Sequence, residues 1–191
     1  MKLNCISKNS TVNLSLTGLM AALVLVATYF FKIQIATAGG GKTMLGFANV
    51  FCILSGLLLG PVYGGLAAGI GSCLFDLLGG WASSAPVTLV TKFAMAFLCG
   101  WIVWAGKEGN AKKLPRLIVG AVTGSLSYCV LYIATSWLEA AVAGNPTPVI
   151  LAQLATKIPV TLVNAALADV IAIPLFLAIR RALKRSRVSF G

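Results

Sequence analysis

The sequence contains no histidine, only four acidic residues, and 10% charged residues in all. Soluble domains carry about 25% charged residues, whereas 59% of this chain is hydrophobic. The composition therefore predicts an integral membrane protein. A helix that crosses a bilayer needs about 20 apolar residues, so the chain has room for about six such helices and for no sizeable soluble domain.

The absence of histidine removes the commonest ligand of protein-bound metals and the commonest general base of enzymes. The cysteines do not replace it, because no two of them have the spacing of a metal or redox pair. Four of them lie in apolar segments, where cysteine behaves as a small buried hydrophobe. The five cysteines are Cys5, Cys52, Cys73, Cys99 and Cys129. The sequence therefore predicts no metal, no cofactor and no enzymatic activity.

Positive charge is concentrated in three places and gives the chain a net charge of +11. The clusters are Lys2 and Lys8 near the start, Lys107, Lys112, Lys113 and Arg116 in the middle, and Arg180, Arg181, Lys184, Arg185 and Arg187 at the end. A basic tail can bind nucleic acid, but beside membrane helices such clusters indicate the cytoplasmic side. We therefore expect cytoplasmic N and C termini, a bacterial plasma membrane location, and no nucleic-acid partner.

The apolar segments predict one all-α membrane domain, residues 1–191, with six transmembrane helices. The expected spans are 14–31, 45–59, 62–78, 86–105, 115–138 and 149–179. The first could be a signal peptide, but its apolar segment is longer than the 7–15 residues that are usual there, so we interpret it as a retained helix. Residues 32–44 are predicted to be a flexible loop that can cover a site. Their Gly-Gly-Gly-Lys-Thr stretch is no phosphate-binding loop, because Ala36 stands where that motif needs glycine.

The region 46–80 is the most unusual part of the chain, because it joins two short apolar segments at Gly60-Pro61. Its glycines recur at helical spacing, which lets membrane helices approach closely. The two ridges consist of Gly60, Gly64 and Ala68, and of Gly65 and Gly69. We expect them to act as a scaffold, or as a surface that slides against a partner and lipid.

Four ionisable residues lie in or at the edge of the predicted spans: Asp76, Lys92, Lys157 and Asp169. Each costs about 2.5–3.5 kcal/mol at the centre of a membrane helix, so each needs a reason to be there. The span directions place the first three in one outer layer. Asp169 lies deeper, where it could pair with the basic tail or meet a partner.

Polar and aromatic residues share helix faces with these groups. Lys157, Thr161 and Asn164 share one face, Thr88 lies one turn from Lys92, and Tyr128 lies one turn from Tyr132. A small-molecule pocket open to the outside follows from this pattern. The candidate binding residues are Asn49, Asp76, Trp81, Thr88, Lys92, Tyr128, Tyr132, Lys157, Thr161 and Asn164. Two structural alternatives remain open: a buried Asp76–Lys92 ion pair, and tyrosines that only mark the membrane interface.

The segment NVFCILSGLLLGPVYGGLAAGIGSCLFDLLGG (49–80), followed by APVTLVTK (85–92), resembles the S components of energy-coupling factor (ECF) transporters. It is most similar to the riboflavin-type branch. The resemblance implies a six-helix protein that binds a vitamin or precursor at the outer side, among the first loop and spans four to six. It also implies partners: a membrane-embedded T subunit and two ATPases, which energise import. The T-subunit contact would use Gly18, Ala21 and Ala22 on the first helix.

Two other functions are weighed against this one. A self-sufficient secondary transporter is disfavoured because no second half repeats the first. A membrane-embedded enzyme would need a convergent set of acid, base or nucleophile, which this chain lacks. The ligand stays open: free lysines would suit an anion such as pantothenate. A neutralised Lys92 would suit riboflavin, a pyridoxine-like ring or a pyrimidine precursor.

Overall fold

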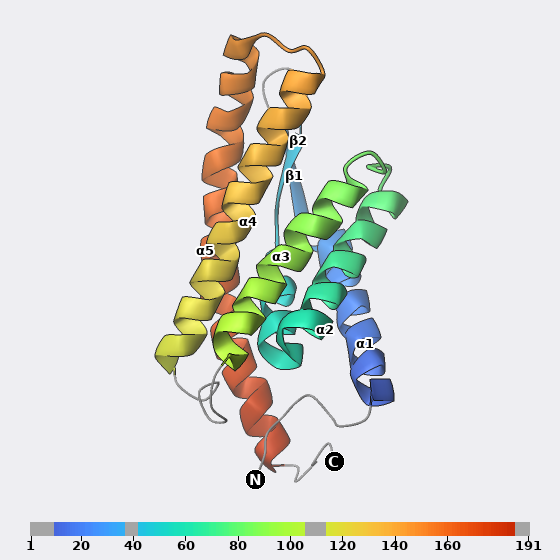
Figure 1. The fold of residues 1–191 in the computed structure, drawn as a ribbon, viewed down its shortest axis with the longest axis vertical. Coiled ribbons are helices and arrows are strands. Elements are labelled where there is room, and N and C mark those ends of the chain that lie inside the picture. Colours follow the sequence, from blue (N-terminus) through green and yellow to red (C-terminus); the bar gives the residue numbers. More distant parts are fainter. Residues whose placement is uncertain (1–9, 37–41, 106–113, 186–191) are drawn as a thin grey trace.

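The computed structural model describes residues 10–36, 42–105 and 114–185. In this part of the chain five helices surround a two-stranded hairpin (Figure 1). The elements are α1 (Ser10–Phe30), β1 (Lys32–Ala36), β2 (Lys42–Gly46), α2 (Ala48–Leu78), α3 (Ala85–Trp104), α4 (Leu114–Val142) and α5 (Thr147–Arg185). All five helices are long and apolar enough to cross a membrane.

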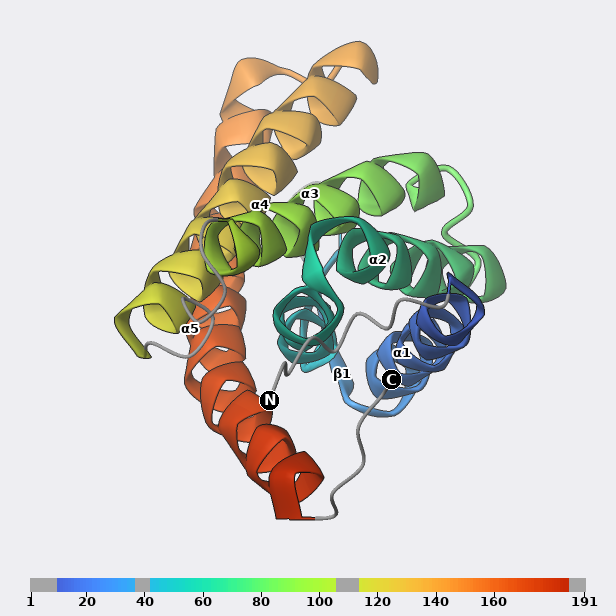
Figure 2. The ribbon, with the colours of Figure 1, turned by 60° about the horizontal axis from the view of Figure 1, so that its bottom comes forward.

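Helix α2 is broken at Gly60, whose φ of 79° and ψ of −170° are not helical. A positive φ is accessible to glycine at little steric cost, and Pro61 then starts the second arm. Figure 2 shows the two arms running in different directions. They pack against each other, because Ser55 Oγ donates a hydrogen bond to the Gly64 carbonyl at 3.0 Å. The junction that the sequence places at Gly60-Pro61 is therefore a break inside α2.

The expected count of six spans remains a prediction. The first arm, residues 48–59, has a length of about 18 Å at the rise of an α-helix. The hydrocarbon core of a bilayer is about 30 Å thick. The arm is thus too short to cross it alone, and the described residues contain five helices of spanning length.

The glycines of α2 make close contacts within the chain. A Cβ at Gly56 would lie 2.4 Å from the Ala96 carbonyl oxygen of α3, and a Cβ at Gly71 would lie 2.4 Å from the Ala21 carbonyl oxygen of α1. A Cβ at Gly65 would lie 2.9 Å from the Phe93 ring. These glycines therefore act as scaffold. They bring α1 and α3 against the centrally placed α2, whose side chains form much of the core.

The all-α membrane fold is confirmed by the five long helices, but the first loop is not the flexible segment that we expected. Residues 32–36 and 42–46 form an antiparallel hairpin in which Lys32 pairs with Gly46 and Ala36 with Lys42. The physical reason lies in Ile33 and Ile35, which alternate with polar residues as is typical of a strand. The three glycines of the predicted flexible stretch, residues 39–41, lie outside the described residues.

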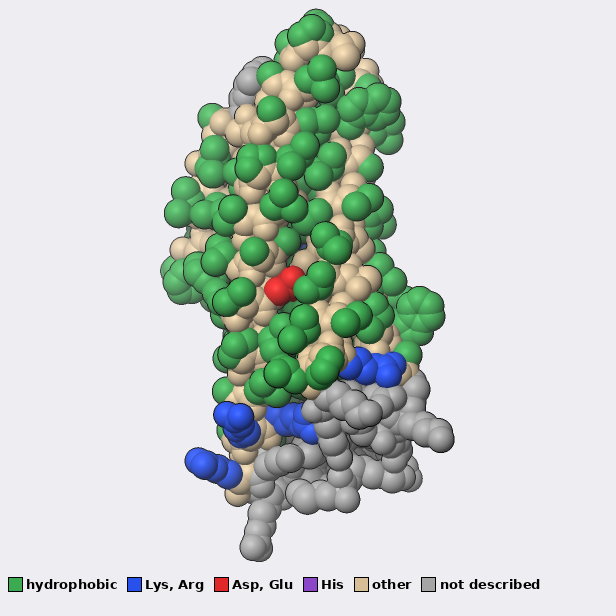
Figure 3. Space-filling model, turned by 90° about the vertical axis from the view of Figure 1, so that its left-hand side faces the viewer, with side chains coloured by type: hydrophobic (Ala, Val, Ile, Leu, Met, Phe, Trp, Pro, Cys, Tyr) green, Lys and Arg blue, Asp and Glu red, His purple; other side chains and the backbone are tan. Residues whose placement is uncertain are grey.

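Basic residues gather at one end of the molecule. Helices α1 and α4 begin and α5 ends towards the lower end of Figure 1. Figure 3 shows Lys and Arg side chains of the described residues at that end, below a largely apolar face with acidic side-chain atoms near its middle. Each helix also exposes large apolar side chains, including Leu19, Val62, Val90, Val130 and Val170. This surface is typical of a protein surrounded by lipid. The charge distribution is consistent with cytoplasmic termini, which remain a prediction.

Candidate ligand-binding site

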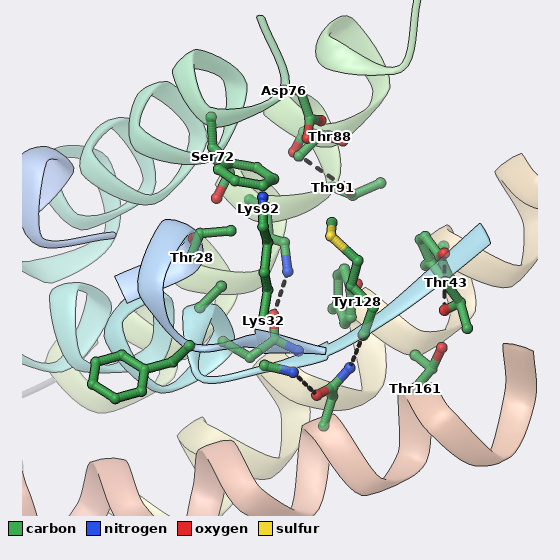
Figure 4. A pocket seen from close by; sticks show the side chains of 18 residues that line it. Thr28, Lys32, Thr43, Ser72, Asp76, Thr88, Thr91, Lys92, Tyr128 and Thr161 are labelled. Atoms are coloured by element: carbon green, nitrogen blue, oxygen red, sulfur yellow. Dashed lines mark hydrogen bonds between the residues drawn. The ribbon is translucent and has the colours of Figure 1, made fainter. Parts of the chain in front are cut away.

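A cavity of about 100 Å³ lies beneath the β-hairpin (Figure 4). A single water needs only about 10–15 Å³ by a comparable measure, so the space suits a small molecule. All five helices contribute to its wall. The lining residues are Thr28, Phe31, Lys32, Thr43, Met44, Gly46, Ala48, Asn49, Ser72, Phe75, Asp76, Thr88, Thr91, Lys92, Tyr128, Tyr132, Thr161 and Asn164.

Eight of the ten residues proposed from the sequence line this cavity. They are Asn49, Asp76, Thr88, Lys92, Tyr128, Tyr132, Thr161 and Asn164. The other two, Trp81 and Lys157, do not. Trp81 lies beyond the end of α2, where its backbone N–H donates to the Asp76 carbonyl at 2.8 Å. Lys157 is buried one helical turn from Thr161, and its Nζ lies 5.9 Å from the centroid of the Tyr132 ring.

Lys92 is held by groups other than Asp76. Its Nζ donates a hydrogen bond to Asn49 Oδ1 and lies 3.8 Å from the centroid of the Tyr128 ring. A cation over an aromatic face is stabilised by the ring quadrupole. Lys92 therefore does not form the alternative ion pair with Asp76. It contacts the Asn49 amide of α2 and the Tyr128 ring of α4 instead.

Two buried polar atoms on the cavity wall have no hydrogen-bond partner among the described residues. They are Asp76 Oδ2 and Asn49 Nδ2. Both side chains are only 3% exposed, and both line the cavity. Figure 4 shows Thr88 beside Asp76 at the upper edge of the site. Buried polar groups are almost always hydrogen-bonded, so these two atoms mark positions where a bound molecule can supply the partner.

Asn164 attaches the hairpin to α5. Its Nδ2 donates to the Met44 carbonyl at 2.7 Å, and its Oδ1 accepts from the Gly46 N–H at 2.9 Å. Met44 and Gly46 are two residues apart, so their backbone groups lie on the same edge of β2. The Asn164 carboxamide thus hydrogen-bonds the backbone groups of this β2 edge, as a neighbouring strand would. Thr43 Oγ1 adds a 3.5 Å contact with Tyr132 Oη, so Asn164 acts here as a clamp on the hairpin.

Sequence reasoning missed several residues of the wall. Ser72 lies one helical turn before Asp76, so the face argument used for the later helices would have found it. Lys32 was assigned only to an outer loop, yet it lines the cavity, and its Nζ lies 4.6 Å from the centroid of the Phe75 ring. Thr28 and Thr43 gave no signal, because their place depends on the hairpin.

The remaining predicted residues lie away from the cavity. Gly18 and Ala22 are exposed on α1, whereas Ala21 is buried against α2. Asp169 has its partner on α4, because its Oδ1 accepts a 2.8 Å hydrogen bond from Ser125 Oγ. It therefore links α4 to α5.

Comparison with known proteins agrees with this architecture. The family model described as "ECF-type riboflavin transporter, S component" matches residues 8–181. A protein of Pyrococcus woesei, described only as an "Uncharacterized protein in gap 3'region", is 30% identical over 115 residues, which is 60% of this chain and 72% of that protein. The family model covers nearly the whole chain, and the protein belongs to the family of S components of ECF-type riboflavin transporters.

Proposed function

We propose that this chain is the substrate-binding subunit of an ECF importer that takes up riboflavin or a related vitamin or precursor. The observation that carries the proposal is the cavity beneath the hairpin, lined by residues of all five helices, in a chain whose family transports such a ligand. A T subunit and two ATPases are the proposed partners. Substrate capture is the role of this chain, and energy comes from the partners.

The position of the cavity supports capture from outside. Helix α1 begins near the basic end, and the hairpin follows its far end. In the predicted orientation the cavity therefore lies in the outer half of the membrane, and the location is the bacterial plasma membrane. When the hairpin closes, Asn164 satisfies the β2 edge and the polar wall is shielded. A surface without open polar groups is easier to reorient in lipid, which is the step that would carry the ligand inward.

The exposed face of α1 supports a contact with the T subunit. Gly18 is exposed, and a Cβ built there would meet nothing within 4 Å. Ala22 is exposed one turn later. Small residues at this spacing let a partner helix approach closely in lipid. Ala21 supports the face from behind by packing on Gly71.

The test is reconstitution of uptake. The purified chain is incorporated into liposomes alone, or together with an ECF T subunit and its two ATPases, and riboflavin entry is followed with and without internal ATP. We expect ATP-dependent accumulation only with the complete set of subunits, and none with ATPases that cannot hydrolyse ATP. Accumulation by the chain alone, driven by an ion gradient, would instead establish a secondary transporter.

A further inference from the structure

Two polar atoms on the cavity wall lack a hydrogen-bond partner within the described part of the chain, one an acceptor and the other a donor. Asp76 Oδ2 is an acceptor without a donor, and Asn49 Nδ2 is a donor without an acceptor. Both belong to α2, one on each arm, and both side chains are almost fully buried. Because the protein supplies neither partner, a molecule that fills the cavity gains most if it donates to the first and accepts from the second.

Three threonine hydroxyls on the wall add acceptors and no donors. Thr28 Oγ1 donates to the Val24 carbonyl at 2.6 Å, and Thr161 Oγ1 donates to the Lys157 carbonyl at 2.7 Å. Thr91 Oγ1 donates in the same way within α3, at 3.1 Å. Since each hydroxyl has one hydrogen, these oxygens can offer only lone pairs to a ligand. These three oxygens therefore favour a ligand that carries O–H or N–H groups.

The two lysines of the cavity are already engaged. Lys92 donates to Asn49 and lies over Tyr128. Lys32 Nζ lies 4.6 Å from the centroid of the Phe75 ring and 5.0 Å from that of Tyr29. An anionic ligand would have to draw a lysine away from these contacts. It would also bring its charge near the Asp76 carboxyl, whose Oδ2 has no hydrogen-bond partner among the residues described, and like charges repel strongly where water is excluded.

We propose that the site selects an uncharged, hydrogen-donating ligand that donates to Asp76 Oδ2 and accepts from Asn49 Nδ2. It discriminates against the carboxylate form of an otherwise identical molecule. This inference rests on the proposed function, since it concerns the substrate of that same cavity. It also removes one alternative left open by the sequence, an anionic vitamin held by the lysines.

The experiment compares matched ligand pairs on the full-length protein in detergent. Each pair exchanges a carboxylate for a neutral donor group: pantothenate and panthenol, nicotinate and nicotinamide, 4-pyridoxate and pyridoxine. Riboflavin serves as the reference for the proposed function, and binding is measured by native mass spectrometry. We expect each bound pair to favour its neutral member by roughly tenfold or more. A preference for any anionic member would overturn the inference and leave the proposed function standing.

Substitutions test the two atoms directly. Asp76→Asn should weaken riboflavin, or the tightest neutral probe, by roughly tenfold or more, because a charge-assisted hydrogen bond is lost. Asn49→Asp keeps the oxygen that Lys92 contacts and removes the free donor, so it should weaken the same probe. Asp169→Asn is the matched control, because it makes the same change at a membrane carboxyl outside the cavity.

Thermal unfolding of each variant separates binding from folding. If Asp76→Asn folds and binds the neutral probe as tightly as the unaltered protein, the inference is wrong. It is also wrong if Asp76→Asn and Asp169→Asn weaken the probe equally, because Asp76 would then act only through stability. If neither riboflavin nor any paired ligand binds, the proposed vitamin-binding function fails, and the inference fails with it.

Discussion

Replacing Asn164 with leucine is expected to release the hairpin from α5. Leucine has nearly the same shape as asparagine and can make neither of the two hydrogen bonds, to the Met44 carbonyl at 2.7 Å and from the Gly46 N–H at 2.9 Å. The loss of both destabilises the closed hairpin by about 1–3 kcal/mol, since a net hydrogen bond contributes about 0.5–1.5 kcal/mol. The open fraction should therefore rise roughly 5- to 150-fold.

Hydrogen exchange measures this opening without a ligand. The Gly46 amide is the direct reporter, because its hydrogen is the one that Asn164 accepts. Exchange of the β2 amides in the detergent-solubilised protein should accelerate by the same factor as the open fraction, while amides in the middle of α2 stay protected. With a ligand present, its dissociation rate should rise in parallel.

Ser125→Ala is the control for this experiment. It removes another hydrogen bond between α4 and α5, from Ser125 Oγ to Asp169 Oδ1, and does not touch the hairpin. Its β2 amides should exchange as in the unaltered protein. If Asn164→Leu folds and its Gly46 amide exchanges no faster than in the control, the two hydrogen bonds do not hold the hairpin, and the assignment of Asn164 as a clamp is refuted.

Three further predictions concern other parts of the chain. Gly71→Ala should lower the free energy of unfolding by about 1–3 kcal/mol, because the new methyl group would meet the Ala21 carbonyl oxygen at 2.4 Å. The control Gly18→Ala should leave stability unchanged, and equal melting temperatures for the two variants would contradict the prediction. Gly18→Leu should fold normally and yet no longer co-purify with the T subunit. A variant that still co-purifies would contradict the proposed contact. Lys92→Met should leave Asn49 Oδ1 without its partner and weaken the bound vitamin, whereas unchanged affinity in a normally folded variant would remove Lys92 from the site.

The helical faces of the later spans could be predicted because a helix repeats every 3.6 residues. Thr161 and Asn164 do lie on the cavity side of α5, and Tyr128 and Tyr132 stack with ring centroids 5.6 Å apart on α4. The same rule extended the site one turn too far, to Lys157. Periodicity gives the direction of a side chain and not the point along the helix where the cavity ends.

The partners of the polar residues could not be predicted, because they depend on how distant segments pack. The sequence leaves open a buried ion pair between Asp76 and Lys92, which it places in the same outer layer. In the structure the break at Gly60 folds the first α2 arm back, and Asn49 on that arm reaches Lys92 first. The role of Asn164 likewise required the hairpin, which was interpreted as an irregular loop.

The broken helix also explains how a glycine-rich scaffold can shape a binding site that its glycines do not line. Asn49 and Asp76 stand on different arms of α2, so the angle at Gly60 sets the separation of their two unpartnered atoms. That angle is constrained by packing, since a Cβ at Gly100 of α3 would lie 2.6 Å from the Gly60 carbonyl carbon. The close approach of α3 therefore holds the bend, and the bend holds the donor and the acceptor at a fixed spacing. Selectivity for a ligand then depends on glycines at the opposite end of the arms as much as on the side chains that touch it.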